Sequence, residues 1–240
     1  MIDLKNRKVA VFIDAENVSA QHIDNILSEA SNYGDVIIKR VFADWSSPLM
    51  KSWVEKISLQ SLKPEQQFSA IKGKNSSDIS LIVSVLTALF EKSIDVFCLV
   101  SNDSDFTRLV QELREREKTV VGFGTTQSVP TVYVNSFSEF IYLDSNKGKK
   151  DKEKTGGGNN LPKDRIIALR EIIETLIERN GKALYNVIMM EMRNKFADFV
   201  PKNYGSETMS DFMKKNLPAI GKYEIKTDKD KSTRYLVRGS

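Results

Sequence analysis

Four aspartates stand where apolar runs meet helices, and their placement is suited to divalent-metal chemistry. Asp14 lies near the end of the apolar run Val9–Ala15, and Asp103 and Asp105 follow the apolar run Ile94–Val100. Asp78 stands directly before the apolar helix expected at Ile79–Lys92. Runs of this length indicate buried strands of a parallel sheet, whose carboxyl ends meet at one edge. We therefore predict that these four acids share one crevice at that edge.

Carboxylates brought this close repel one another unless a cation lies among them. Hard oxygen ligands favour Mg²⁺ or Mn²⁺, and such an ion can polarise a phosphoryl oxygen and lower the pKa of a bound water. We predict that Asp14, Asp78, Asp103 and Asp105 are the metal ligands and the catalytic residues of a phosphodiester hydrolase. The single histidine, His22, lies in a predicted helix at Ala20–Asn32 and is expected on its surface or in its packing.

Several of these residues also have a simpler interpretation. Asp78 and Asp105 could complement helix N-termini, whereas Asp14 and Asp103 interrupt apolar runs and are not expected to cap a helix. Asn17, in the turn after Asp14, could bind a substrate phosphate or orient water, or could satisfy turn backbone; we favour substrate binding. The role of Glu16 stays open.

The spacing of apolar residues predicts an α/β fold in which strands alternate with helices along residues 1–145. Strands are expected at Val9–Ala15, Asp35–Ala43, Gln67–Ile71, Ile94–Val100, Lys118–Gly124 and Glu139–Leu143. Such alternation favours a mainly parallel sheet flanked by helices. Neither a Gly-x-Gly-x-x-Gly turn nor a Gly-Lys-Ser/Thr loop follows a strand, so no dinucleotide or P-loop site is indicated.

The chain of 240 residues is expected to form two domains joined by a linker. Residues 146–160 contain no apolar side chain, and their composition predicts a flexible basic linker. In residues 161–240 the pattern predicts three helices, the first closed by Asn180-Gly181, and a final hairpin of Lys222–Lys226 with Arg234–Arg238. That order predicts a small winged helix-turn-helix domain.

Charge is divided unevenly along the chain. Residues 1–145 carry 15 Lys and Arg against 19 Asp and Glu, a net charge of −4. Residues 146–160 have a net charge of +3 and residues 161–240 one of +5. The split suggests one half that holds metal and a second half that favours polyanions.

Composition also indicates a cellular setting. A single cysteine, Cys98, excludes an internal disulfide framework and a multi-cysteine zinc site. No apolar run is long enough to span a bilayer, and Val9–Ile13 leads into an acid instead of a signal-peptide cleavage site. We therefore expect a cytoplasmic protein with no membrane partner.

Three motifs together resemble the NYN domains, relatives of the PIN nucleases, over residues 8–144. The motifs are Phe12-Ile-Asp-Ala-Glu-Asn17, Ser-Ser-Asp78 before an apolar helix, and Val100-Ser-Asn-Asp-Ser-Asp-Phe106. The resemblance implies a PIN-like fold and a Mg²⁺- or Mn²⁺-dependent ribonuclease site at Asp14, Asp78, Asp103 and Asp105. The family commonly has Gly where this chain has Asn102, and Lys-Gly-Val where it has Asn75-Ser-Ser.

Residues 163–238 resemble an OST-HTH domain, also called LOTUS, through Asn203–Pro218 and the closing hairpin. This resemblance implies binding of RNA, including structured or G-rich RNA, or a protein-docking role. The first hypothesis is therefore a metal-dependent endoribonuclease with a C-terminal RNA-binding domain. The alternatives are a catalytically weak RNA-binding or adaptor protein, and a phosphatase or flap-type DNA nuclease that uses the same acids.

Overall fold

The computed structural model describes residues 6–66, 76–126, 129–144, 161–228 and 233–239. Contacts between residues divide the chain into two compact units, Met1–Leu143 and Asp144–Ser240. The basic linker predicted at residues 146–160 lies outside the described residues.

The first unit is built on a six-stranded sheet in the order β3-β2-β1-β4-β5-β6, in which every neighbouring pair is parallel. Its strands are β1 (Lys8–Asp14), β2 (Asp35–Ala43), β3 (Lys63–Gln66), β4 (Val96–Val100), β5 (Thr119–Gly124) and β6 (Glu139–Tyr142). All five residues of β4 are buried, as are the last six of β1. The predicted α/β class with a parallel sheet flanked by helices is confirmed.

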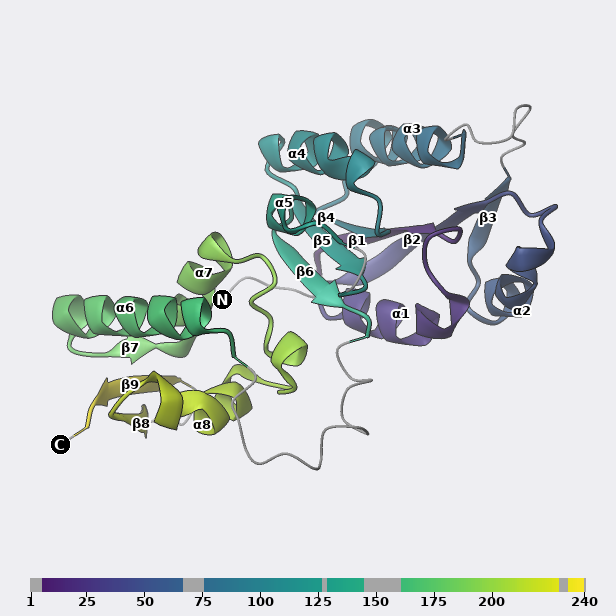
Figure 1. The fold of residues 1–240 in the computed structure, drawn as a ribbon. Helices are drawn as coiled ribbons and strands as arrows, with labels where there is room; N and C mark the ends of the chain where they lie inside the picture. Colours follow the sequence, from purple (N-terminus) through teal and green to yellow (C-terminus); the bar gives the residue numbers. More distant parts are fainter. Residues whose placement is uncertain (1–5, 67–75, 127–128, 145–160, 229–232, 240) are drawn as a thin grey trace, which may run out of the picture. The chain divides into compact units, whose positions relative to one another are not determined.

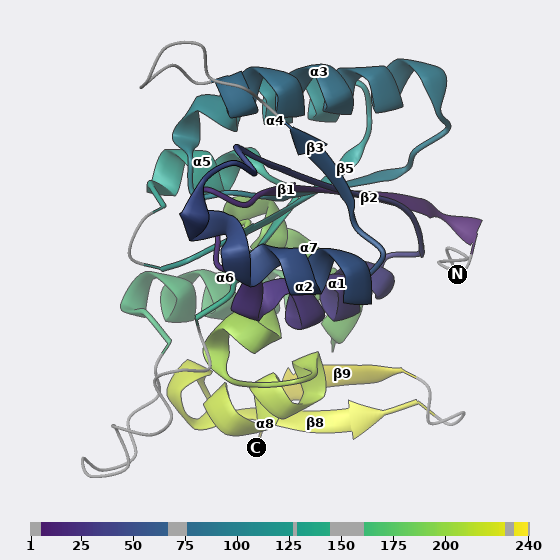
Figure 2. The same cartoon turned by 90° about the vertical axis from the view of Figure 1, so that its right-hand side faces the viewer.

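Helices cover both faces of this sheet. Figures 1 and 2 show α3 and α4 over one face and α1 and α2 over the other. Their bounds are α1 (Ile23–Ser31), α2 (Lys51–Leu59), α3 (Ser76–Glu91), α4 (Thr107–Glu115) and α5 (Thr131–Ser136), with single 3-10 turns η2 (Ala20–His22), η3 (Pro48–Met50) and η4 (Ser104–Phe106). This two-sided cover explains why the central strands are apolar throughout instead of alternating.

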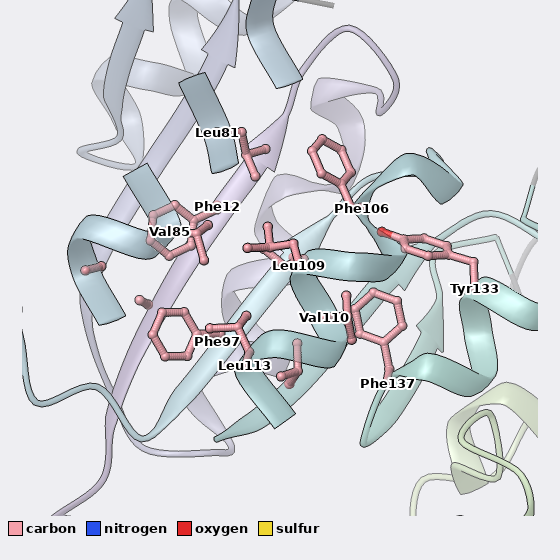
Figure 3. Close-up of a cluster of buried hydrophobic side chains, with 14 of the residues drawn as sticks. Phe12, Leu81, Val85, Phe97, Phe106, Leu109, Val110, Leu113, Tyr133 and Phe137 are labelled. Atoms are coloured by element: carbon pink, nitrogen blue, oxygen red, sulfur yellow. The ribbon is translucent and has the colours of Figure 1, made fainter. Parts of the chain in front are cut away.

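One hydrophobic cluster fixes α3, α4 and α5 against the sheet (Figure 3). Phe12 of β1 stacks on Phe97 of β4, with ring centroids 6.2 Å apart. Tyr133 of α5 and Phe137, the residue directly after this helix, meet edge to face at 4.9 Å, and this aromatic contact helps to hold the short helix. The tips of β1 and β4 are therefore anchored to one rigid core.

The structure corrects several predicted boundaries. The third strand is Lys63–Gln66, whereas the predicted strand Gln67–Ile71 lies outside the described residues. Lys63-Pro64 does not resemble an apolar strand. Among the described residues, however, β3 pairs with β2 on one side only, and an edge strand tolerates proline. His22 is buried, as expected for a packing residue.

The second unit contains three α-helices and a three-stranded antiparallel sheet among its described residues. They are α6 (Lys163–Asn180), β7 (Ala183–Leu184), α7 (Tyr185–Lys195), η6 (Pro201–Tyr204), α8 (Met209–Ile220), β8 (Tyr223–Thr227) and β9 (Arg234–Arg238). Gly181 ends α6 in the left-handed conformation at φ 70°, which confirms the predicted helix end. The short strand β7 was not predicted, and it pairs with β9 beside the predicted hairpin. Within the described parts of the chain, no helix is long and apolar enough to cross a membrane.

Candidate active site at the end of β1 and β4

The strand order places β1 and β4 side by side at the point where the order reverses. In open α/β sheets, this switch point opens a crevice beyond the carboxyl ends of the two strands. Asp14 is the last residue of β1, and Asp103 follows β4 by three residues. The two predicted acids therefore come from neighbouring strands at the edge that the sequence indicated.

Asp14 is held in a dense set of hydrogen bonds, although its side chain is almost completely buried. Its Oδ2 accepts from the Ser101 hydroxyl at 2.7 Å and from Asn17 Nδ2 at 2.7 Å. Its Oδ1 accepts from the backbone N–H groups of Glu16 and Asn17 at 3.2 and 3.3 Å. Burial raises the pKa of Asp14, and the Ser101 and Asn17 hydrogen bonds oppose that rise.

Asp103 and Asp105 lie in the turn that leads into α4. Asp103 is the N-cap of η4, and its Oδ1 accepts from the Asp105 backbone N–H at 2.9 Å. The expectation that Asp103 caps no helix was therefore wrong, because Asp103 caps η4 and Asp105 lies in its first turn. Ser101 Oγ accepts from the Asp103 backbone N–H at 3.0 Å, so one hydroxyl joins Asp14 to the Asp103 turn.

Asp78 lies in the first turn of α3 and is half-buried. Its pKa is raised to about 6, first by burial and then by the carboxylates of Asp14, Asp103, Glu16 and Asp105. Asp14, Asp103 and Asp105 are therefore close enough to Asp78 to act on it electrostatically. The repulsion acts in the direction expected of carboxylates that share a cation site.

Asn17 and Glu16 connect the Asp14 turn to its neighbours. The exposed Asn17 orients Asp14 through its side-chain amide, and its backbone carbonyl accepts from Asn102 Nδ2 at 3.0 Å. Glu16 Oε1 accepts from the Asp44 backbone N–H at 3.1 Å, directly after β2. Hydrogen bonds from Ser46 and Gln66 lower the pKa of Asp44. Asp44 is therefore a further acid at this edge that the sequence reasoning missed.

Two other residues of the site were not singled out from the sequence, although both lie inside the Val100–Phe106 motif. Ser101 is buried and bonds both Asp14 and the Asp103 turn. Asn102 accepts from the Thr125 backbone N–H at 2.8 Å and donates to Asn17. Asn102 thus ties together the turns after β1, β4 and β5. A polar residue directly between a buried strand and two acids was the signal that could have identified them.

Tyr133 of α5 lies close enough to Asp103 and Asp14 for their carboxylates to act on its hydroxyl. Its ring is fully buried, and its hydroxyl has no hydrogen-bond partner among the described residues. Figure 3 shows the hydroxyl end of Tyr133 directed toward Phe106 in η4. Burial raises the pKa of Tyr133, and the Asp103 and Asp14 carboxylates raise it further. The hydroxyl therefore stays protonated at neutral pH.

The side chains suit a hard divalent cation by their chemistry. The donors are carboxylate oxygens, and the described groups that shift the pKa of Asp78 are all acidic. Among the described residues, however, no three His, Cys, Asp or Glu side chains are grouped closely enough to hold a metal ion. The neighbouring carboxylates thus repel the charge of Asp78, but the described acids do not form a closed cage around a metal ion.

Comparison with known proteins identifies a family and provides a relative in fold. The NYN domain model matches residues 8–144. A crystal structure of a protein of unknown function from Vibrio parahaemolyticus superposes with a TM-score of 0.50 at 18% identity, covering 60% of this chain and 96% of that one. A comparison with curated proteins found no match. At this identity the structural likeness concerns the fold alone.

Proposed function

The chain belongs to the NYN domain family, and from that premise we propose that it is a divalent-metal-dependent endoribonuclease whose C-terminal unit holds the RNA. NYN domains belong to the PIN-like nuclease superfamily, which suggests a nuclease. We propose in addition that the metal is Mg²⁺ or Mn²⁺, that the substrate is RNA and that the four aspartates are the metal ligands.

One observation carries the proposal. At the switch point of the sheet, the Ser101 hydroxyl joins Asp14 to the Asp103 turn. The carboxylates of Asp14, Asp103, Glu16 and Asp105 act together with burial to raise the pKa of Asp78, in the first turn of α3, to about 6. Concentrated negative charge of this kind costs free energy in the folded chain and is relieved by a bound cation. A protein that only needed this fold would gain stability by losing one of these acids.

Each residue has a proposed role in positioning or binding. Asp14, Asp78, Asp103 and Asp105 would hold Mg²⁺ or Mn²⁺, which when bound supplies positive charge to a phosphoryl oxygen and acidifies water. Ser101 orients Asp14 and the Asp103 turn through its hydroxyl. Asn17 holds Asp14 Oδ2 with its side-chain amide, and in the proposal this exposed amide also contacts a substrate phosphate.

The C-terminal unit supplies the proposed RNA contact. Its three helices and antiparallel sheet are compatible with a winged helix-turn-helix of the OST-HTH or LOTUS type. Residues 161–240 have a net charge of +5, which attracts polyanions, whereas residues 1–145 have one of −4. Structured or G-rich RNA is the expected ligand of this unit.

The test compares cleavage of labelled RNA and DNA by the full chain in Mg²⁺, Mn²⁺ or EDTA. Asp103→Asn should abolish cleavage and keep the fold, because Asn removes the charge but still caps η4. Asp95→Asn is the matched control, since Asp95 accepts from the Lys8 backbone at the start of β1. Undiminished cleavage by Asp103→Asn, or cleavage in EDTA, would contradict the proposal.

A second candidate function is favoured by a specific observation. Among the described residues, no three acidic, His or Cys side chains form a group that could hold a metal ion. The second candidate is therefore a catalytically weak RNA-binding or adaptor protein that retains the NYN fold in residues 8–144. RNA binding by wild type without cleavage in either metal would select this candidate.

A further inference from the structure

A cavity of about 570 Å³ lies in the C-terminal unit between the start of α7, the start of α8 and the start of β9. Its walls are Tyr185, Asn186, Thr208, Met209, Ser210, Thr233 and Arg234. The volume is in the range of small-ligand sites and is larger than a single ion requires. The lining combines one cation, hydroxyls, an amide and two apolar surfaces.

The α8 end of this cavity offers backbone hydrogen-bond donors from the first turn of the helix. The 12-residue helix α8 begins at Met209, and Thr208 caps the Asp211 backbone N–H at 3.1 Å. The backbone N–H groups of Met209 and Ser210 have no intrahelical acceptor, as in the first turn of any α-helix. Together with the positive end of the helix dipole, such groups favour phosphate oxygens.

Tyr185 adds an independent sign of a ligand. The residue is 8% exposed and lines the cavity, yet its buried hydroxyl has no hydrogen-bond partner among the described residues. A buried hydroxyl without a partner destabilises the folded chain unless a ligand accepts its hydrogen bond. Burial raises the pKa of Tyr185 while the Arg234 guanidinium lowers it, so the hydroxyl is a protonated donor close to a positive charge.

Arg234 supplies that charge. Its Nη1 donates to Ser210 Oγ, which leaves its other N–H groups for a ligand. Among the described residues, no carboxylate forms a salt bridge with Arg234, whereas Arg238 on the same strand is paired with Glu174 and Glu178. Asp211 is the acid of the first helical turn, and its carboxylate accepts from the Thr208 hydroxyl.

We propose that this cavity binds a phosphate group of an RNA nucleotide, with Arg234, the Tyr185 hydroxyl and the first turn of α8 as donors. The apolar surfaces of Tyr185 and Met209 would contact the attached sugar or base. The proposal deepens the proposed function, on which it rests for the choice of RNA, by naming the chemical group and the residues of the C-terminal contact.

The test measures binding of a fluorescent, G-rich structured RNA to the full chain by anisotropy, in EDTA so that the RNA is not cleaved. Arg234→Gln should weaken binding by about tenfold or more, because a charge-assisted bond to phosphate contributes about 1.5 to 3 kcal/mol. Arg234→Lys should recover part of the loss, since it keeps the charge without the guanidinium fork. Arg238→Gln removes the same charge from the same strand outside the cavity, and equal losses in the two Gln variants would overturn the proposal.

Tyr185→Phe separates a ligand role from a structural one. If the hydroxyl is a ligand donor, the variant should bind RNA several-fold more weakly while its melting temperature is unchanged or higher. Tyr235 follows Arg234 in β9 and does not line the cavity, so Tyr235→Phe should leave RNA binding unchanged. Unchanged binding by Tyr185→Phe, with a raised melting temperature, would overturn the proposal.

Additional arms identify the source of the phosphate. The same RNA is compared with and without a 5′-phosphate. If the 5′-phosphate tightens binding and this gain in affinity disappears in Arg234→Gln, the cavity binds a terminal phosphate. If both RNAs bind equally and both depend on Arg234, the cavity binds a phosphate of the backbone. Arg234-dependent binding of a phosphoserine peptide, without any effect on RNA, would overturn the RNA assignment.

Failure of the two proposals can be distinguished. Arg234-dependent RNA binding without cleavage by wild type would refute the nuclease and support the cavity. Cleavage that depends on Asp103, with binding insensitive to Arg234 and Tyr185, would do the reverse.

Discussion

The Ser101 hydroxyl lies 2.7 Å from Asp14 Oδ2, so a single hydrogen bond joins the end of β1 to the residue that follows β4. The same oxygen of Ser101 accepts from the Asp103 backbone N–H. The position of Asp14 and the shape of the Asp103 turn thus depend on one buried side chain.

Ser101→Ala should lower the free energy of unfolding by about 1 to 3 kcal/mol, because it leaves a buried carboxylate oxygen with one donor fewer. It should also raise the pKa of Asp14 further, since the Ser101 bond now opposes the effect of burial. Urea unfolding at neutral pH measures the loss. Ser136→Ala is the control, because this buried hydroxyl donates only to the Tyr133 carbonyl of its own helix. Equal losses in both variants, with unchanged cleavage, would argue against a special role for Ser101.

Asn102→Ala should lower stability by about 1 to 3 kcal/mol through loss of its bonds to Asn17 O and the Thr125 N–H. Cleavage should fall as well, because the turn that carries Asn17 is released from the turn after β4. The exposed Asn135 in α5 provides a control Asn→Ala substitution. Thermal unfolding and single-turnover cleavage measure both effects. A stability loss without any change in cleavage would confine Asn102 to folding.

Asp78→Asn should stabilise the metal-free protein increasingly as the pH rises. The pKa of Asp78 is about 6 in the folded chain against 3.8 in the unfolded one, so the folded state binds more protons between these values. Raising the pH through this window therefore lowers wild-type stability, and the loss is complete above about pH 6. Urea unfolding in EDTA from about pH 4 to 7 should show the variant's advantage growing across this window. Asp103→Asn should reduce the effect, because it removes one of the repelling charges; a pH-independent difference would contradict the interpretation.

Mn²⁺ or Mg²⁺ should raise the melting temperature of the full chain, because an ion that binds only the folded state stabilises it by about 2.7 kcal/mol at a hundredfold excess over its Kd. Asp14→Asn should lose most of this shift. Asp95→Asn should keep it, since its carboxylate lies at the amino end of the strands and accepts from Lys8. Differential scanning fluorimetry across a metal titration provides the measurement. Equal responses of wild type and Asp14→Asn would remove Asp14 from the metal site.

The local pattern of the chain determined the central strands of the sheet and the edge at which the site lies. Apolar runs without alternation predicted buried parallel strands, because a sheet covered on both faces buries every side chain of its central strands. The acids at the ends of Val9–Ala15 and Ile94–Val100 were placed correctly at the carboxyl edge for the same reason. The Asn180-Gly181 helix end followed from the conformational freedom of glycine. The edge strand Lys63–Gln66 escaped prediction, because its short, polar sequence carries no periodic signal.

Only the tertiary structure decided which strand ends are neighbours. The order β3-β2-β1-β4-β5-β6 brings β1 beside β4. This pairing creates the contact between Asp14 and Ser101, which lie more than eighty positions apart in the chain. The capping role of Asp103 and the bridging role of Asn102 depend on backbone directions in turns, which the residue types do not specify. The unpartnered hydroxyl of Tyr185 beside Arg234 likewise arises where α7, α8 and β9 meet. Sequence periodicity reports which face of an element is buried, whereas the partners of a polar atom are set by packing between elements distant in the chain.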